Sequence, residues 1–260
     1  MVKILIVENK NLDKELVEAS KLLTVRNFNF LHLFFYEYFF VKSLTKEKLI
    51  KLGIDEHKVF VNDLQENLNI YLKLNMQRLT KQDFSIISDD CWGAYIYTYL
   101  NIPYKSPFIW LHIEPHFDYF KLCSNLNYYL TQKLNFIETK DNYPVAMLDD
   151  IEIHFNHYKS EQNVKECWER RINRLNLDAL YCKATLYEQN EINLFENIPI
   201  QNKIGFANKD IIHTISSKNI LLLNNDTSFI DFWQVAQLQS YKYFDIINWL
   251  NDGVITPTVY

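Results

Sequence analysis

The first eighty residues alternate between apolar runs typical of strands and amphipathic stretches typical of helices. "VKILIVE" (2–8) predicts a buried strand, and apolar residues at helical spacing follow at 12–23. "FNFLHLFF" (28–35) predicts a second strand. A helix from Thr45 to Gly53 and a strand at Val59–Val61 complete a β-α-β-α-β order. This order predicts a small Rossmann-like parallel sheet, although no G-x-G-x-x-G motif supports a dinucleotide site.

The pattern changes near Thr80, where we place a boundary between domains 1–80 and 81–260. A strand predicted at 84–87 leads into "SDDCWG", and a helix is expected from there to about Leu100. Two prolines predict a loop over 101–108. Further helices are predicted at 116–130, 161–175 and 232–250, with a strand at 151–158. The expected fold class is α/β, a small Rossmann-like module followed by a larger α/β domain with a mixed sheet.

Composition narrows the classes of partner and compartment. The net charge is −5 and no long basic run occurs, which argues against nucleic acid. The 17 tyrosines and 5 tryptophans include rings that could stack on sugars, although most are expected in the core. We find no signal peptide and no apolar stretch long enough to span a bilayer, so a cytoplasmic location is expected. The four cysteines are widely spaced, which predicts reduced thiols and no metal site.

Cys91 stands where the strand at 84–87 gives way to a helix. A helix N-terminus lowers the pKa of a thiol, whereas the nearby carboxylates of Asp89 and Asp90 raise it. Gly93 could let backbone N–H groups approach an oxyanion. The alternative is that Cys91 is a small buried packing residue under a tight turn.

The stretch "HFNHY" supplies two candidate bases for Cys91. His154 and His157 lie three residues apart on a predicted strand, so they face opposite sides and do not suit one metal ion. One of them, within about 4 Å of Cys91, would serve as its base. A structural hydrogen bond is the alternative role for each. "HIEPH" (112–116) would form a metal pair only in a helix, which Pro115 disfavours.

Three arginines in "ERRINR" lie on the helix predicted at 161–175. Arg170 and Arg174 are four residues apart and share a face, while Arg171 points elsewhere. A solvated helix face is the default interpretation. The alternative is a site for a phosphate or carboxylate group, which guanidinium groups bind with two hydrogen bonds.

Several separated motifs together resemble a known bacterial family. "IISDDCWG", "SPF", "YYL", "YPV", "HFNHY" and "CWERRINRL" occur in the order expected for domain-of-unknown-function family 1919, known mostly as exopolysaccharide-biosynthesis proteins. The resemblance spans residues 84–206. This chain has Asp89 and Asp90 where the family usually has two asparagines, and Ala94 where a second glycine is common. The order of motifs is also similar to a group of papain-like cysteine proteins.

The resemblance implies a role in surface or capsular polysaccharide biosynthesis. One branch of the papain-like group is linked to acetyl transfer from coenzyme A, which would make this chain a transferase that acylates a glycan or its precursor. Cys91 would then be the nucleophile, and His157 or His154 the base. The residues implied in substrate binding are Trp92, Gly93, Ser106, Tyr158, Arg170, Arg171 and Arg174. The alternative is a non-catalytic protein that binds a sugar or nucleotide-sugar.

Overall fold

The computed structural model describes residues 4–7, 38–41, 59–61, 64–209, 215, 217–223 and 231–257. The chain divides into two compact units, Met1–Tyr71 with Thr258–Tyr260, and Leu72–Pro257. The boundary predicted near Thr80 remains a prediction.

In the first unit, three short strands form a parallel sheet of order β1-β2-β3. They are β1 (Ile4–Val7), β2 (Tyr38–Val41) and β3 (Val59–Val61). The predicted strands at both ends of this segment are confirmed. The strand predicted at 28–35 and the helices predicted between the strands lie outside the described residues, so the Rossmann-like character of this unit remains a prediction.

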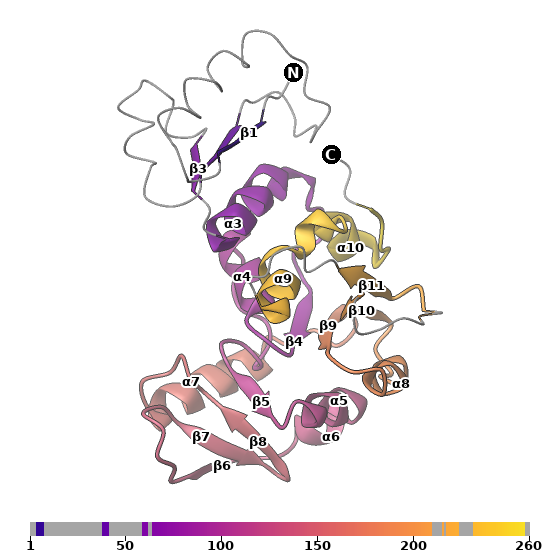
Figure 1. Ribbon diagram of the computed structural model, residues 1–260. Coiled ribbons are helices and arrows are strands. Elements are labelled where there is room, and N and C mark those ends of the chain that lie inside the picture. Colours follow the sequence, from indigo (N-terminus) through magenta and orange to yellow (C-terminus); the bar gives the residue numbers. More distant parts are fainter. Residues whose placement is uncertain are drawn as a thin grey trace, which may run out of the picture. The chain divides into compact units, whose positions relative to one another are not determined.

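The second unit contains a parallel sheet of order β11-β10-β9-β4 (Figure 1). Its strands are β4 (Ser85–Ser88), β9 (Leu180–Leu186), β10 (Asn202–Asn208) and β11 (Ile220–Leu223). Every residue of β4 and β9 is buried. A parallel sheet is buried in this way when helices cover both of its faces.

Aromatic side chains anchor the helices on one face of this sheet. These helices are α4 (Trp92–Tyr99), α9 (Phe232–Leu238) and α10 (Ile246–Asp252), with the 3-10 helix η3 (Ser240–Lys242). The ring of Trp249 lies 5.9 Å from that of Trp92 and 4.9 Å from that of Tyr181 on β9. Trp92 Nε1 also donates to Ser240 Oγ at 2.9 Å.

The opposite face carries a separate apolar cluster. It includes Cys182 and Ala184 of β9 together with Leu122 of α5 (Phe117–Ser124) and Phe195 of α8 (Glu191–Glu196). Because 182 and 184 alternate with 181 and 183 along β9, the two clusters take opposite faces of the same strand. The short helix α6 (Leu126–Tyr129) follows α5.

The connection between β4 and β9 holds an antiparallel sheet of order β5-β8-β7-β6. Its strands are β5 (His112–Glu114), β6 (Leu134–Ile137), β7 (Val145–Leu148) and β8 (Ile151–His154). The helix α7 (Glu161–Ile172) lies beside this sheet (Figure 1), with the Trp168 ring 6.2 Å from that of Phe155. Ser160 caps α7 by accepting from the N–H of Asn163 at 3.2 Å.

The predicted α/β class of the larger domain is confirmed, but its single mixed sheet is wrong. Parallel and antiparallel strands form two separate sheets. The helix predicted at 116–130 is divided at Asn125, whose φ of −126° is not helical. The helix predicted at 232–250 is also divided, because Asp245 adopts an extended conformation and caps α10.

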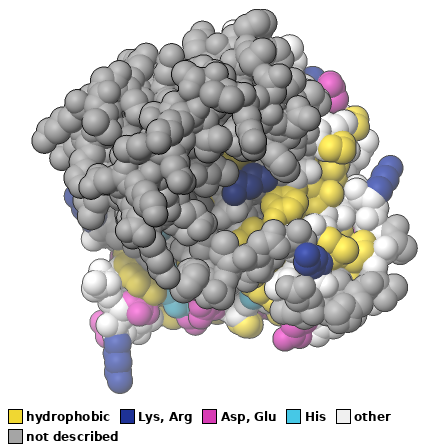
Figure 2. Space-filling view, turned by 45° about the horizontal axis from the view of Figure 1, so that its top comes forward, with side chains coloured by type: hydrophobic (Ala, Val, Ile, Leu, Met, Phe, Trp, Pro, Cys, Tyr) yellow, Lys and Arg dark blue, Asp and Glu magenta, His cyan; other side chains and the backbone are white. Residues whose placement is uncertain are grey.

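Two further observations concern membranes and surface charge. Among the described residues, no helix combines the length and apolar character needed to cross a bilayer. On the face shown in Figure 2, the lysine and arginine side chains of the described residues stand apart from one another. The described residues visible on this face therefore form no continuous basic patch.

Helix α3 (Leu64–Asn75) and the 3-10 helix η2 (Met76–Arg78) precede β4. Within the second unit, Arg78 Nη2 donates to Asp245 Oδ2 at 2.5 Å and to Asn248 Oδ1 at 2.9 Å. These bonds tie the entry to the parallel sheet to its last helix.

Candidate active site

Cys91 lies in the turn between β4 and α4, immediately before the first helical residue. Two side chains of the same turn accept from the first helical N–H groups: Asp90 Oδ1 from Trp92 at 2.9 Å, and Ser88 Oγ from Gly93 at 3.0 Å. A Cβ at Gly93 would come within 2.9 Å of Ile86 Cγ2. Gly93 is therefore required for close packing of α4 on β4, and its N–H already has an acceptor.

His157 contacts Cys91 from the turn that follows β8. The Cys91 Sγ lies 3.6 Å from His157 Nε2, within the 4 Å expected from the sequence. The His157 ring also lies 5.1 Å from the ring of Trp110. The structure thus brings together two residues from the ends of two different sheets.

The environment of Cys91 favours the protonated thiol. Burial and the adjacent Asp90 carboxylate raise the pKa of Cys91 to about 12, which outweighs the effect of Lys183. From the sequence, the nearby carboxylates were expected to raise the pKa of Cys91 and the helix N-terminus to lower it. In the structure, burial and the Asp90 carboxylate prevail, and the pKa is raised. Cys91 is therefore a thiol at neutral pH, so attack by sulfur requires transfer of its proton to His157.

Beside Cys91, a fully buried lysine binds both acidic residues of the turn. Lys183 Nζ lies 2.9 Å from Asp89 Oδ1 and 2.6 Å from Asp90 Oδ2, and its side chain has no exposed surface. Burial opposes ionisation of Asp89, but Lys183 and His116 hold the pKa of Asp89 well below its usual range. Burial and the Asp89 charge raise the pKa of Asp90, because together they outweigh its ion pair with Lys183.

His116 extends this network of charges. Its Nε2 lies 3.2 Å from Asp89 Oδ2, and its Nδ1 lies 2.9 Å from Glu191 Oε1. Burial disfavours the charged ring, but the two carboxylates raise the pKa of His116 to about 9. Glu191 Oε2 in turn accepts from the N–H of Tyr187 at 2.6 Å. The network therefore fixes the turn that carries Cys91 at the carboxyl ends of β4 and β9.

The second candidate base, His154, contacts other residues, and the base beside Cys91 is His157. It is 8% exposed, its Nε2 lies 2.8 Å from Glu152 Oε1, and its Nδ1 lies 3.4 Å from the Tyr143 hydroxyl. Its ring stacks on that of His112 with centroids 4.7 Å apart. Burial and His154 lower the pKa of His112.

A row of partly exposed aromatic rings leads to the Cys91–His157 pair. The rings of Tyr99 and Tyr95 on α4 stack at 5.6 Å, and the Tyr95 ring meets that of Trp110 edge-on at 5.2 Å. Trp110 then lies against His157. Trp110 Nε1 donates to the Tyr104 hydroxyl at 3.0 Å, which fixes its ring.

Five of the predicted substrate-binding residues make contacts within the protein itself. The Trp92 side chain lies in the core, and the Gly93 N–H is bonded to Ser88. Ser106 is buried and accepts from the N–H of Phe108. Arg171 is 5% exposed, donates to the Tyr158 hydroxyl and lies 4.8 Å from the Tyr104 ring. Tyr158 itself donates to the carbonyl of Ile109 at 2.6 Å. In this structure these five residues contribute to packing and to internal hydrogen bonds.

Arg170 is exposed on α7, and Arg174 is exposed two residues beyond the end of this helix, which stops at Ile172 and not at the predicted residue 175. Arg170 Nη2 donates to Cys167 Sγ at 3.2 Å. A hollow of about 400 Å³ is lined by other residues, among them Cys123, Leu180 and Ile200. Leu180 begins β9, so this hollow lies at the amino ends of the strands, opposite the edge that carries Cys91.

The roles of Lys183, His116 and Glu191 were not predicted from the sequence, where His116 was considered only as part of "HIEPH" (112–116). Lys183 occupies an otherwise uncharged strand, "LYCKATL", and a lone lysine in a fully buried strand is a signal, because burial of its charge requires acidic partners. His116 and Glu191 belong to no recognisable local pattern. Their connection depends on the tertiary fold.

Comparison with known proteins places most of this unit in one family. The model of a domain of unknown function, DUF1919, matches residues 62–251. An uncharacterized protein of Haemophilus influenzae is 35% identical over 188 residues, which cover 70% of this chain and 91% of the relative. The region matched by the family model includes the Cys91 turn, the antiparallel sheet, α7 and the buried charge network.

Proposed function

The chain belongs to the DUF1919 family, and within that family we propose that it is a cysteine-dependent transferase that acylates a glycan of the cell surface or its precursor. Cys91 is the proposed nucleophile and His157 the proposed base. The observation that carries the proposal is the 3.6 Å contact between Cys91 Sγ and His157 Nε2.

The raised pKa of Cys91 defines how the pair would work. His157 Nε2 takes the thiol proton as Sγ attacks the carbonyl carbon of an acyl thioester, such as acetyl-coenzyme A. The donor thiolate leaves and receives this proton, and Cys91 carries the acyl group. A hydroxyl of the acceptor then attacks the acyl carbon, passing its proton to His157. Sγ leaves as thiolate and recovers the proton, which restores the resting pair.

The aromatic row of Tyr99, Tyr95 and Trp110 supports a sugar as the acceptor. Partly exposed tyrosine and tryptophan rings present both an apolar face and a polar group, a combination that suits stacking on a sugar ring. The row ends at His157, the residue that would deprotonate the acceptor hydroxyl. The sequence resemblance to exopolysaccharide-biosynthesis proteins points to the same class of acceptor.

Mass spectrometry of the protein incubated with acetyl-coenzyme A tests the first half of the reaction. We expect an acetyl group on the Cys91 peptide, released by hydroxylamine as a thioester would be. His157→Gln should slow its formation by about 10²-fold or more, the usual contribution of a general base. Cys167→Ser, which removes a buried thiol of α7, is the matched control and should acylate normally. Equal rates for wild type and His157→Gln would refute the assignment of the base.

In cells, Cys91→Ser is expected to abolish acylation of the surface glycan while the protein remains folded, because the substitution changes the volume little but gives a poorer nucleophile. Glycan analysis of strains that carry Cys91→Ser or Cys167→Ser measures this. Unchanged acylation in the Cys91→Ser strain would mean that Cys91 is a packing residue.

A further inference from the structure

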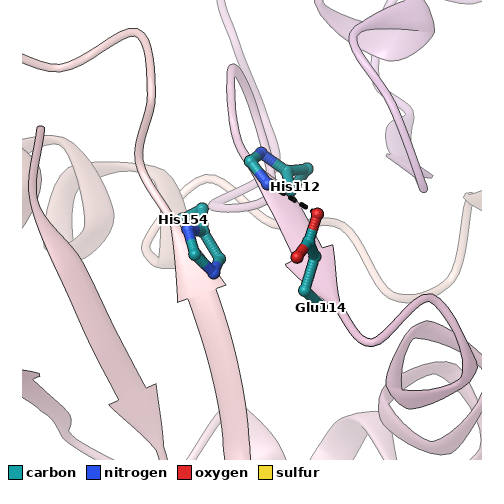
Figure 3. A group of neighbouring side chains, drawn as sticks. All are labelled: His112, Glu114 and His154. Atoms are coloured by element: carbon teal, nitrogen blue, oxygen red, sulfur yellow. Dashed lines mark ion pairs between the residues drawn. The ribbon is translucent and has the colours of Figure 1, made fainter. Parts of the chain in front are cut away.

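Strands β5 and β8 bring two histidines and two glutamates to one face of the antiparallel sheet. The register pairs His112 with His154 and Glu114 with Glu152. Residues two apart on a strand share a face, so all four side chains project from the same side. Figure 3 shows that His112 and His154 extend from neighbouring strands and that the Glu114 carboxylate lies beside His112.

The donor atoms of His112, Glu114 and His154 already lie close together. One ligand atom of each falls within 4.8 Å of the other two. His112 Nε2 lies 3.4 Å from Glu114 Oε1. In a tetrahedral Zn²⁺ shell with bonds of about 2.0–2.1 Å, neighbouring ligand atoms are about 3.3 Å apart. The histidine–glutamate pair therefore has this separation, and the ligand atom of His154 lies within 4.8 Å of those of the other two residues.

We propose that His112, Glu114 and His154 bind a divalent transition-metal ion, of which Zn²⁺ is the representative. Two imidazoles and one carboxylate form a donor set that suits Zn²⁺ in sites with an open coordination position. His154 is buried, His112 is half-buried and Glu114 is exposed, so the fourth position faces solvent and takes water. This proposal is independent of the proposed acyl transfer and uses neither Cys91 nor His157.

Both ring nitrogens of His154 have partners: Glu152 Oε1 lies 2.8 Å from Nε2, and the Tyr143 hydroxyl lies 3.4 Å from Nδ1. The ion therefore replaces one of these hydrogen bonds, and the partner of the other nitrogen orients the ring. Both strands thus contribute a histidine and a carboxylate, but only Glu114 supplies a ligand atom close to both histidines.

Titration of the full chain, stripped of metal by a chelator, with Zn²⁺ in competition with a chromophoric chelator tests the site. We expect the wild type to bind one equivalent of Zn²⁺. His112→Ala and Glu114→Ala should each weaken this binding more than about 100-fold. Glu152→Gln and Tyr143→Phe show which ring nitrogen of His154 binds the ion, because the variant that removes the orienting partner should weaken binding about 10–100-fold. Co²⁺ reports the same site through its visible absorption, which depends on coordination geometry.

His157→Gln is the matched control, because it removes a histidine three residues from His154 that lies outside the cluster. It should leave the Zn²⁺ stoichiometry and affinity unchanged. Circular dichroism verifies the fold of each variant, and Glu114→Ala carries the test if a histidine variant unfolds, since Glu114 is exposed. Binding that is equal in wild type, His112→Ala and Glu114→Ala would overturn the proposal, as would its loss in His157→Gln.

Discussion

At the scale of single residues, the ionic interactions of Lys183 show how the turn at Cys91 is held. A lysine with no exposed surface is stable in β9 because two carboxylates and the Thr185 hydroxyl surround its ammonium group. Burial opposes the charged form, yet Asp89 and Asp90 keep the pKa of Lys183 above its ordinary value. The two aspartates of this turn therefore share one buried cation.

Lys183→Met should lower the free energy of unfolding by about 3–5 kcal/mol, because it removes the buried cation that Asp89 and Asp90 share and leaves Asp89 with His116 as its cationic partner. Urea denaturation measures this. The control is Lys121→Met, which removes a lysine paired with Asp150 at the surface and should cost less than about 1 kcal/mol. Similar losses for both variants would show that the buried pair adds little stability.

His116 should give the protein a pH-dependent stability. Its pKa rises from 6.5 to about 9 on folding. Below pH 6.5 the ring is charged in both states and its contribution is fully present. That contribution declines as pH rises from about 6.5 and is lost above about 9. Unfolding free energies of wild type and His116→Gln between pH 6 and 10 test this, and the wild type alone should lose this increment. A titration midpoint near 6.5 for the NMR signal of the His116 ring would contradict this prediction.

At the scale of elements, the packing of α4 on β4 depends on the absence of a side chain at residue 93. Gly93→Ala would place a Cβ 2.9 Å from Ile86 Cγ2 and 3.0 Å from Ser88 Oγ. Overpacking of this kind costs about 1–3 kcal/mol, and here it would also displace the Cys91 turn. We expect both a lower unfolding midpoint and slower acylation of Cys91. Unchanged stability would show that α4 can shift freely.

Asp245 links two elements, because one carboxylate serves two purposes. Its Oδ1 accepts from the N–H groups of Ile247 and Asn248 at the start of α10, and its Oδ2 pairs with Arg78. Asp245→Asn keeps the capping group and loses only the charge, whereas Asp245→Ala loses both. We expect Asp245→Ala to be less stable than Asp245→Asn by about 1 kcal/mol, the usual value of an N-cap, in urea unfolding. Equal stabilities would mean that the cap contributes nothing.

The elements that the sequence predicted are those with strong local signals. Ser160 followed by an apolar stripe located α7, and the apolar run before "SDDCWG" located β4. The strands β5, β6 and β7 have three or four residues each and were not predicted. The breaks at Asn125 and Asp245 also escaped, because helical periodicity continues across them.

The candidate site was predictable to a similar extent. Cys91 was recognisable from its position at a strand-to-helix turn, and "HFNHY" supplied His157. The pairing of His112 with His154 was not recognisable, because it depends on the register between strands that are about forty residues apart. Sequence spacing alone could test only contacts within one element, which is why a metal site was not expected.

At the scale of the whole molecule, the family relationship separates the second unit from the first. The matched region begins at residue 62, near the start of α3, and the Haemophilus relative is covered over 91% of its length by 70% of this chain. The relative is therefore the shorter protein. The second unit, Leu72–Pro257, contains the four-stranded parallel sheet, the antiparallel sheet and the buried charge network.

A protein that comprises residues 62–260 should therefore fold without the β1-β2-β3 sheet of the first unit. We expect one cooperative urea transition and the near-ultraviolet circular dichroism of packed tryptophans, because Trp92 and Trp249 are buried against each other within the second unit. Lys183→Met provides an internal check, since its cost depends on contacts inside this unit. That cost should agree between the truncated and full-length proteins within about 0.5 kcal/mol, as expected for independent regions. A truncated protein without a cooperative transition would mean that the first unit is needed to complete the core of the second.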